Sequence, residues 1–235
     1  MNIEDLFFDL DHTIWDFEAN ANETLKELHE FYRIEERCGA TTEDFLSTYH
    51  KVNDKYWDLY RKHKIEKARL RTIRFSETFE LLGLPKTEIS KDIWSVYLDI
   101  CPTKTQLMPG ARETLDYLGG KNKLHIITNG FAETQRRKLE HSSLSHYFTS
   151  LTISEEVGFQ KPHPTIFNTA LQNANSSNKQ GHYIGDNPIA DVQGGLNSGW
   201  NVVWFNPDDK ELEPKTIANS RLRIISNLAE LKDIY

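Results

Sequence analysis

The sequence has few cysteines: its 235 residues include two, Cys38 and Cys101. These lie far apart and form no short paired spacing such as CxxC, so the sequence offers neither a disulfide framework nor a cysteine-ligated zinc site. The nine histidines are scattered without the spacing that zinc ligands show. We therefore expect two reduced thiols and no zinc site.

Basic charge is also scarce. Lys and Arg total 28 against 35 Asp and Glu, which gives a formal net charge of −7. A surface that binds a nucleic-acid polymer needs a basic footprint, so we expect no such partner. A small anionic substrate is still compatible with this charge, because a few Lys and Arg side chains can reverse the field inside one cleft.

Long hydrophobic runs are missing. No apolar stretch approaches the length of a membrane span, and the segment MNIEDLFFDLD has acidic residues where a signal peptide carries basic ones. Hydrophobic residues nevertheless make up 38% of the chain, which is enough to bury a core. We expect a cytoplasmic protein without a membrane partner, present as a monomer or a homodimer.

Short apolar segments that alternate with amphipathic ones fill most of the chain. The apolar segments predict strands at 6–10, 124–128, 151–154, 182–185 and 201–205. The amphipathic segments predict helices at 111–118, 133–141, 165–174 and 189–197. Strands alternating with helices indicate the α/β class, here a parallel, doubly wound, Rossmann-like sheet inside a three-layer α/β/α sandwich.

The segment between the first and second strands has another pattern. Phe45, Tyr49 and Val52 recur at helical spacing, as do Phe75 and Phe79. We predict about four helices there and no strand. The chain is thus expected to divide into an α/β core domain and an inserted helical cap domain, with the core at 1–15 and 103–235 and the cap at 16–102.

Polar side chains gather where the predicted strands end. In an open α/β sheet, ligands bind outside the carboxyl ends of the strands, near the point where the strand order reverses. The side chains found there are Asp9 and Asp11, then Thr128, Asn129 and Gly130, then Lys161, and finally Asp186, Asn187 and Asp191. We therefore expect one site built from four separate segments.

Several carboxylates that converge on one site repel each other unless cations compensate them. A lysine and a divalent cation relieve that repulsion, and hard oxygen ligands suit Mg²⁺. A phosphoryl group then has a place among the metal, Lys161 and the backbone amides that follow Thr128. One carboxylate can attack that group as a nucleophile, while a second serves as acid and base. The pattern indicates magnesium-dependent chemistry on a small phosphorylated metabolite.

The segments DLDHT, TNG, KP and GDNPIAD stand in the order of the four motifs of the haloacid dehalogenase (HAD)-like superfamily, which the chain resembles. The resemblance implies that Asp9 is the nucleophile and a Mg²⁺ ligand. Asp11 would be the general acid and base, with its backbone carbonyl on the metal, and Asp186 would be a further ligand. Asp191 and Asn187 would contact the metal ligands rather than the metal itself.

The resemblance extends over residues 8–205 and also assigns the phosphate site. Thr128 and the amides of Asn129 and Gly130 would hold phosphoryl oxygens. Lys161 would neutralise both the phosphate and the nucleophile. Each motif by itself is weak, because turns and helix N-caps share its composition, so the interpretation depends on all four in order.

Two positions depart from the pattern of the superfamily. His12 stands where many members carry Gly, and His163 follows the KP motif where Asp is frequent. Neither change removes a residue to which the resemblance assigns a catalytic role.

The helical insertion matches the cap of the first subclass, which closes over the core and selects the leaving group. The segments FDLDHTIWDFEANA, TNG and 71–75 further resemble the pyrimidine 5′-nucleotidase branch. We hypothesise that Arg71 or Arg74 contacts the substrate. An aromatic stripe is expected to pack between helices rather than stack on a base, and it consists of Tyr49, Tyr56, Trp57 and Tyr60.

The predicted function is Mg²⁺-dependent phosphomonoester hydrolysis through a phosphoaspartate, with a pyrimidine nucleoside monophosphate as the substrate. A phosphatase for phosphoglycolate or a sugar phosphate is an alternative with the same motifs. A 2-haloacid dehalogenase would need neither a metal nor an acid at Asp11. A catalytically silent HAD-like binding domain is the remaining alternative. It is disfavoured by four intact residues, which are Asp9, Asp11, Lys161 and Asp186.

Overall fold

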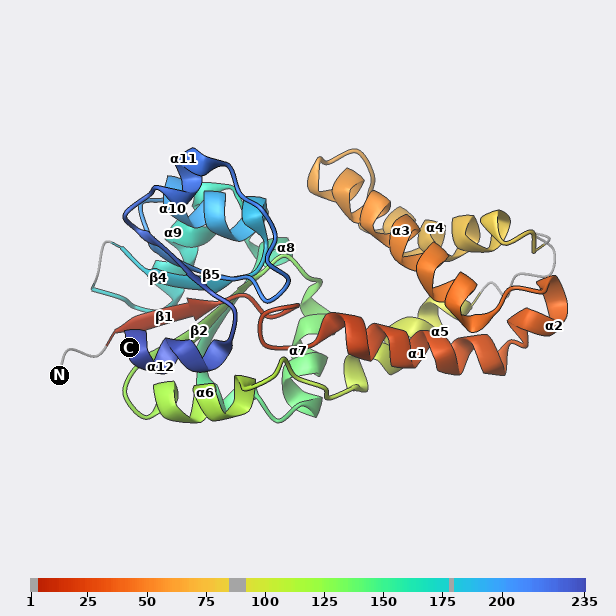
Figure 1. Ribbon diagram of the computed structural model, residues 1–235, viewed down its shortest axis with the longest axis horizontal. Coiled ribbons are helices and arrows are strands. Elements are labelled where there is room, and N and C mark those ends of the chain that lie inside the picture. Colours follow the sequence, from red (N-terminus) through yellow and green to blue (C-terminus); the bar gives the residue numbers. More distant parts are fainter. Residues whose placement is uncertain (1–3, 85–91, 178–179) are drawn as a thin grey trace. The chain divides into compact units, whose positions relative to one another are not determined.

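The computed structural model describes residues 4–84, 92–177 and 180–235, and the chain folds as two units (Figure 1). One unit comprises Met1–Phe17 with Thr105–Tyr235, and the other comprises Glu18–Lys104. No helix in the described parts of the chain combines the length and the apolar character that crossing a membrane would take.

The first unit is built on a parallel sheet, and six strands of it lie among the described residues, in the order β3-β2-β1-β4-β5-β6. Leu6 of the central strand pairs with Leu124 on one side and with His182 on the other. The strands are β1 (Asp5–Phe8), β2 (Lys123–Thr128), β3 (Phe148–Ile153), β4 (His182–Gly185), β5 (Asn201–Phe205) and β6 (Leu222–Ile225). This sheet confirms the predicted α/β, Rossmann-like class.

Helices cover both faces of the sheet, which makes three layers (Figure 1). On one face lie α6 (Ala111–Gly119) and α12 (Leu231–Ile234), and on the other lie α9 (Pro164–Asn173) and α10 (Gly194–Asn197). The unit also contains α7 (Ala132–His141), α8 (Ser154–Val157), α11 (Pro214–Ile217), the 3-10 turns η2 (Ser145–Tyr147) and η4 (Leu228–Glu230), and the π-helical turn η3 (Pro188–Gln193).

The core under α9 explains why the last three residues of β1, Leu6 to Phe8, are apolar. Phe7 packs with Ile127, Phe167 and Trp200 in one fully buried cluster. A parallel strand covered by helices on both faces needs a continuous apolar run rather than an alternating one. The sequence LFF supplies such a run immediately before Asp9.

Two predicted strands differ from the structure in extent, and one strand of the structure was not predicted. The first strand ends at Phe8, so Asp9 and Leu10 lie beyond it, in the loop, rather than inside it. β3 begins at Phe148 instead of residue 151, and Ser154 already starts α8. β6 was not predicted, because it is a four-residue edge strand whose middle residues are exposed.

The second unit is helical. Its described residues form no strand, in agreement with the prediction for this segment. A capping box between Thr41 and Asp44 starts the longest helix. The helices are α1 (Phe17–Phe31), whose first residue belongs to the first unit, α2 (Ile34–Cys38), α3 (Thr42–Arg61), α4 (Lys67–Leu81) and α5 (Ile93–Ile100), followed by the 3-10 turn η1 (Cys101–Thr103).

Aromatic side chains fill the space between α3 and α4. The rings of Phe45 and Phe79 stack at 5.7 Å, and those of Tyr49 and Phe75 lie 5.0 Å apart. Tyr49 is thus a packing residue, as expected for the stripe. The other three members of the stripe are half-buried, and they are Tyr56, Trp57 and Tyr60.

Candidate active site

Asp9 lies directly after the central strand, at the carboxyl edge of the sheet. Its backbone N–H donates to the carbonyl of Ile184 at 2.8 Å, so the position of Asp9 is fixed by the neighbouring strand β4. The strand order reverses between β1 and β4, which is where ligands bind in doubly wound sheets. The carboxylate is nearly buried and lies 2.7 Å from the ammonium of Lys161.

Lys161 joins three polar groups. Its Nζ donates to Asp9 Oδ1 and to the hydroxyl of Tyr183, both at 2.7 Å, and it lies 2.8 Å from Asp191 Oδ1. These contacts use the three hydrogens of the ammonium. Burial alone would lower the pKa of Lys161, but Asp191 and Asp9 outweigh burial and raise the pKa, so the side chain stays charged.

Asp9, Asp186 and Asp191 form a carboxylate cluster in which one oxygen of each lies within 4.8 Å of the others. Three carboxylates face one lysine, so the cluster is short of positive charge. Burial raises the pKa of Asp9 to about 8 against the opposing effect of Lys161, and burial together with Asp191 raises the pKa of Asp186 to about 7. A divalent cation with oxygen ligands fits this deficit.

The segment GDNPIAD holds the cluster through its own backbone. The side chain of Asn187 accepts from the amides of Ile189 and Ala190 and caps the turn η3, while the amide of Asn187 donates to Asp191 Oδ2 at 2.9 Å. A Cβ at Gly185 would lie 2.6 Å from the carboxyl carbon of Asp191. The glycine is therefore needed for Asp191 to approach the strand end.

Asn129 ties the second motif to the third. Its Nδ2 donates to the carbonyl of Lys161 at 3.0 Å, and its Oδ1 accepts from the amide of Lys161 at 2.8 Å. Both polar atoms of the Asn129 side chain are thus engaged in positioning Lys161. This leaves the backbone amide as the part of Asn129 that can meet a phosphoryl oxygen.

The Asp11 side chain turns toward α7 and is not part of the carboxylate cluster. Gln135 donates to Asp11 Oδ2 at 2.9 Å, and Lys138 forms an ion pair with Oδ1. Burial would raise the pKa of Asp11, but the charge of Lys138 and the hydrogen bonds from Lys138 and Gln135 outweigh it and lower the pKa. The carboxylate form is therefore favoured in this arrangement.

Three residues of this site were not predicted from the sequence. Tyr183 occupies an apolar position of β4, whereas Gln135 and Lys138 belong to a strongly polar helix. Their spacing of three in α7 gives one helix face, but nothing in the sequence marks that face as buried.

Comparison with known proteins decides the family. A family model described as haloacid dehalogenase-like hydrolase matches residues 6–205. The chain belongs to this family. The match confirms the resemblance on which the four motifs were assigned.

Among relatives of this HAD-like hydrolase are two named pyrimidine 5′-nucleotidases. YjjG of Escherichia coli (strain K12) is 33% identical over 97% of the chain and 96% of its own length. PynA of Streptococcus pneumoniae (strain ATCC BAA-255 / R6) is 32% identical over 88% of the chain and 85% of its own length. The crystal structure of the HAD-hydrolase YfnB from Bacillus subtilis bound to magnesium covers 100% of this chain and 99% of its own, with a TM-score of 0.85 and 28% identity.

The two departures from the HAD-like pattern have local explanations. His12 adopts a φ of 62°, a left-handed conformation that glycine reaches at no steric cost. His163 accepts a hydrogen bond from the amide of Thr165 and so caps α9, as an Asp would do at that position. Both histidines thus occupy backbone positions that suit Gly and Asp, respectively.

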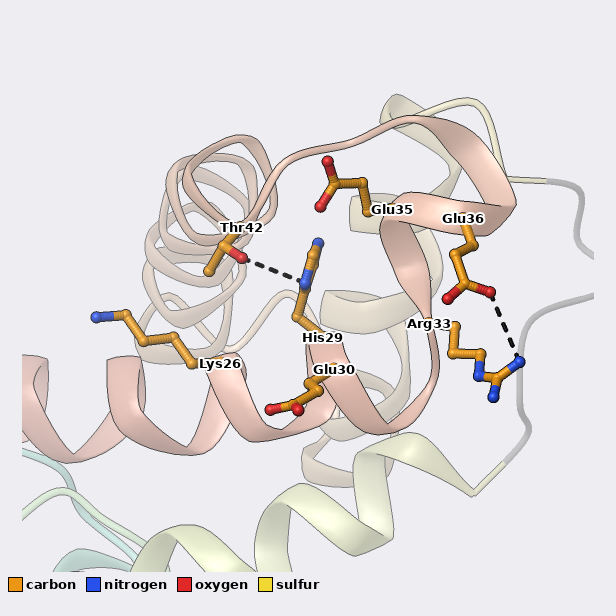
Figure 2. Close-up of a pocket in the computed structure, with 7 residues that line it drawn as sticks. All are labelled: Lys26, His29, Glu30, Arg33, Glu35, Glu36 and Thr42. Atoms are coloured by element: carbon orange, nitrogen blue, oxygen red, sulfur yellow. Dashed lines mark hydrogen bonds and ion pairs between the residues drawn. The ribbon is translucent and has the colours of Figure 1, made fainter.

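The helical unit of this hydrolase has a pocket of its own, of about 460 Å³ (Figure 2). Charges of both signs line it, among them Lys26, Glu30 and Arg33. His29 is not available there as a ligand, because its Nε2 pairs with the carbonyl of Ala40 at 2.9 Å and its Nδ1 contacts Thr42. We assign no ligand to this pocket.

Arg74, one of the two arginines predicted to contact substrate, is buried inside the helical unit. Its Nη1 donates to Asn53 Oδ1 at 2.8 Å, and the guanidinium lies 5.9 Å from the ring centre of Tyr49 and 5.8 Å from that of Tyr97. The side chain therefore belongs to the packing of α3, α4 and α5. Arg71 is only half-buried, which leaves it as the arginine of the pair that we retain for substrate.

Proposed function

We propose that the chain is a Mg²⁺-dependent phosphomonoester hydrolase that forms a phosphoaspartate on Asp9 and acts on nucleoside monophosphates, with a preference for pyrimidine nucleotides. The observation that carries this proposal is the position of Asp9 at the end of the central strand, in contact with Lys161 and inside a carboxylate cluster short of positive charge. The named activity of YjjG and PynA supports the substrate class.

Asp9, Asp186 and the backbone carbonyl of Asp11 would hold the Mg²⁺, with Asp191 and Asn187 behind them. The raised pKa values of Asp9 and Asp186 fit a cation site, because they report carboxylates whose charge is not fully compensated. When bound, the ion would neutralise charge on the phosphoryl oxygens during transfer.

In the first half-reaction, a carboxylate oxygen of Asp9 attacks phosphorus, and the bond from phosphorus to the leaving alcohol oxygen breaks. The protonated carboxyl of Asp11 gives its proton to that oxygen, so the leaving group departs as an alcohol. The Thr128 hydroxyl and the amide of Asn129 hold the phosphoryl oxygens, and the nearby ammonium of Lys161 contributes its positive charge. The product is a phosphoaspartate.

In the second half-reaction, a water molecule gives a proton to the Asp11 carboxylate as its oxygen attacks phosphorus. The bond from phosphorus to the Asp9 oxygen breaks, the carboxylate is restored, and inorganic phosphate leaves. Asp11 now carries the proton needed for the next turnover. A bound phosphoryl dianion favours this protonated form, because its negative charge opposes the effect of Lys138.

We further propose that the helical unit acts as a cap domain that selects the leaving group, with Arg71 contacting the substrate. Its place between the first and second motifs supports this role, as does the match of YjjG along nearly the whole chain, the helical unit included. Exclusion of bulk water during phosphoryl transfer would strengthen the electrostatic contacts to the transferred group.

The test is release of phosphate from a panel of nucleoside monophosphates, sugar phosphates and phosphoglycolate, each with Mg²⁺ and with EDTA. We expect Mg²⁺-dependent release that favours pyrimidine monophosphates and falls by about a thousandfold or more in Asp9→Asn. A preference for sugar phosphates would exclude the nucleotide assignment. Equal turnover in Asp9→Asn would exclude the phosphoaspartate.

A further inference from the structure

Gln135 of α7 lies fully buried between two residues of the proposed active site. Its Nε2 donates to Asp11 Oδ2 at 2.9 Å and to Thr128 Oγ1 at 2.6 Å. A carboxamide nitrogen has two hydrogens, and each of these contacts uses one. The two partners come from different motifs, so this side chain links the first motif to the second.

The orientation of the Gln135 amide is fixed by Asp11. If the amide were reversed, its carbonyl oxygen would face a carboxylate, and the two acceptors would repel each other. In the observed orientation Oε1 is buried and has no hydrogen-bond partner among the described residues. Leaving an acceptor unsatisfied costs free energy, so the contacts of Nε2 determine how this side chain lies.

Gln135 also sets the direction in which Thr128 can donate. The Thr128 hydroxyl accepts from Gln135 Nε2 and from the amide of Gly130 at 3.1 Å. A hydroxyl oxygen has two lone pairs and one hydrogen. With both lone pairs occupied, the hydrogen has to donate to another group, and a phosphoryl oxygen needs such a donor.

Lys138 holds the second oxygen of Asp11 from the same helix. It lies three residues after Gln135 and therefore on the same face of α7. Lys138 is buried, with 3% of its surface exposed. Its ammonium lies 4.1 Å from the ring centre of Trp15. Because one oxygen is held by Lys138 and the other by Gln135, α7 fixes the rotation of the Asp11 carboxylate.

Gly130 gives an independent indication that the place of Gln135 is built into the fold. A Cβ at this position would lie 2.3 Å from Gln135 Nε2, closer than any real contact. A side chain at residue 130 would therefore displace the carboxamide. The presence of glycine at position 130 is therefore explained by the space that Gln135 occupies as well as by the turn.

We infer that Gln135 is a positioning residue for the proposed phosphatase, assisted by Lys138: it orients the Thr128 hydroxyl as a donor to phosphate and holds Asp11 for proton transfer. This inference rests on the function proposed above. It predicts that α7 controls protonation of the leaving group although neither side chain contacts the substrate.

The first experiment compares two esters that differ in their leaving group. An alkyl ester such as uridine monophosphate needs its leaving oxygen protonated, whereas 4-nitrophenyl phosphate needs little help. We expect Gln135→Met to lower kcat by about a hundredfold on the nucleotide and by about tenfold on the aryl ester. A purely structural role would lower both by the same factor.

Variants on the same helix provide the controls. Lys138→Met should show the unequal loss, and Lys138→Arg should restore most of it because it keeps a cationic donor. Arg136→Met removes an exposed ion pair with Glu156 and should leave both rates unchanged. Gln135→Asn keeps a carboxamide one methylene shorter, and it serves as a second variant if Gln135→Met folds poorly by circular dichroism.

The second experiment is a double-mutant cycle between Gly130 and Gln135. We expect Gly130→Ala to lower kcat strongly in the wild type but by less than about threefold in a Gln135→Ala background, where the clash is gone. If the wild type hydrolyses the esters, two results would overturn the inference. One is an equal effect of Gly130→Ala on kcat in both backgrounds, and the other is a loss of kcat in Gln135→Met that is the same for the two esters. A wild type that hydrolyses neither ester with Mg²⁺ would overturn the proposed function and this inference together.

Discussion

At the scale of single residues, the carboxylate cluster opposes metal-free stability. The pKa values of Asp9 and Asp186 rise from 3.8 to about 8 and about 7 in the folded chain. At pH values between 3.8 and the raised pKa values, the folded state holds protons that the unfolded state has released. The stability that these two groups contribute is therefore fully present below about pH 4 and is lost progressively as the pH rises to about 7 to 8.

This linkage predicts how pH and Mg²⁺ act together on unfolding. In EDTA, the melting temperature should fall between about pH 6 and about pH 8, and Mg²⁺ should raise it more at the higher pH, where both carboxylates are ionised. Thermal unfolding in the two conditions measures this. Asp9→Asn should flatten the pH dependence in EDTA, and a variant with the slope of the wild type would contradict the assignment.

Tyr183 makes a second prediction at this scale. Its hydroxyl accepts from Lys161 and donates to Asp191 at 2.9 Å, so Tyr183→Phe removes a partner from each. We expect a loss of about 1–2 kcal/mol in the free energy of unfolding and about a tenfold lower kcat with little change in KM. Urea unfolding and steady-state kinetics measure the two effects.

A matched control shows whether the effect is specific to the buried hydroxyl of Tyr183 or follows from the loss of any tyrosine hydroxyl. Tyr147→Phe also removes a hydrogen bond, to Asp116, but at a partly exposed position remote from the carboxylate cluster in the sequence. Its unfolding free energy should change by less than about 0.5 kcal/mol, and its kcat should be that of the wild type. An equal effect of both substitutions would contradict the role given to Tyr183.

The residues of the four motifs could be predicted because their types and order carry the chemistry, but the residues that hold them could not. Tyr183 stands in the apolar segment HYIG and looks like an ordinary core residue. Gln135 and Lys138 stand in the polar segment AETQRRKLEH and look solvated. Their burial comes from tertiary contacts with Asp11, Thr128 and Trp15, which no local pattern encodes.

At the scale of elements, strands with buried residues were predicted well and the exposed edge was not. The apolar runs of β1, β2 and β5 follow from burial on both faces of a parallel sheet. β6, with the sequence LRII, has an exposed Arg223 and Ile224 45% exposed, so it lacks such a run. Pairing with β5 creates this strand, and the sequence alone shows only four residues between polar segments.

His125 connects three neighbouring strands by its side chain. It lies in β2, its Nε2 is 3.2 Å from Asp5 of β1, and its Nδ1 is 2.8 Å from Ser150 of β3. The ring stacks on Phe7 at 4.7 Å. Burial lowers the pKa of His125, although Asp5 opposes this, so the folded state disfavours the protonated form.

The expected consequence is a pH-dependent contribution of His125 to stability. As the pH falls below the ordinary value of 6.5, the unfolded state takes up a proton that the folded state excludes, and stability is lost. His125→Gln should therefore lower the unfolding free energy by about 1–3 kcal/mol near pH 7.5 and by less near pH 5.5. Urea titrations at the two pH values test this, and an equal cost at both would contradict it.

At the scale of the whole molecule, Arg71 and Arg74 of α4 should separate substrate contact from packing. Arg74→Ala leaves a cavity beside Tyr49 and Tyr97 and removes the partner of Asn53, so it should lower stability by about 2–4 kcal/mol with an unchanged KM. Arg71→Ala should raise KM for the preferred nucleotide by about tenfold with an unchanged melting temperature. A normal KM in Arg71→Ala would remove this residue from the proposed substrate contacts.

The pairing of the central strand has a consequence for how the chain can be made. Phe8 pairs with Ile126 on one side and with Ile184 on the other. Both partner strands of β1 are therefore synthesised long after β1 itself. During translation Asp9, the proposed nucleophile, leaves the ribosome before β4, whose Ile184 carbonyl fixes the backbone of Asp9 in the folded chain. The helical unit is complete in sequence well before then and is free to fold first. A nascent chain arrested before residue 182 therefore carries the proposed nucleophile directly after an apolar strand that lacks one of its two partners, the kind of segment that chaperones bind.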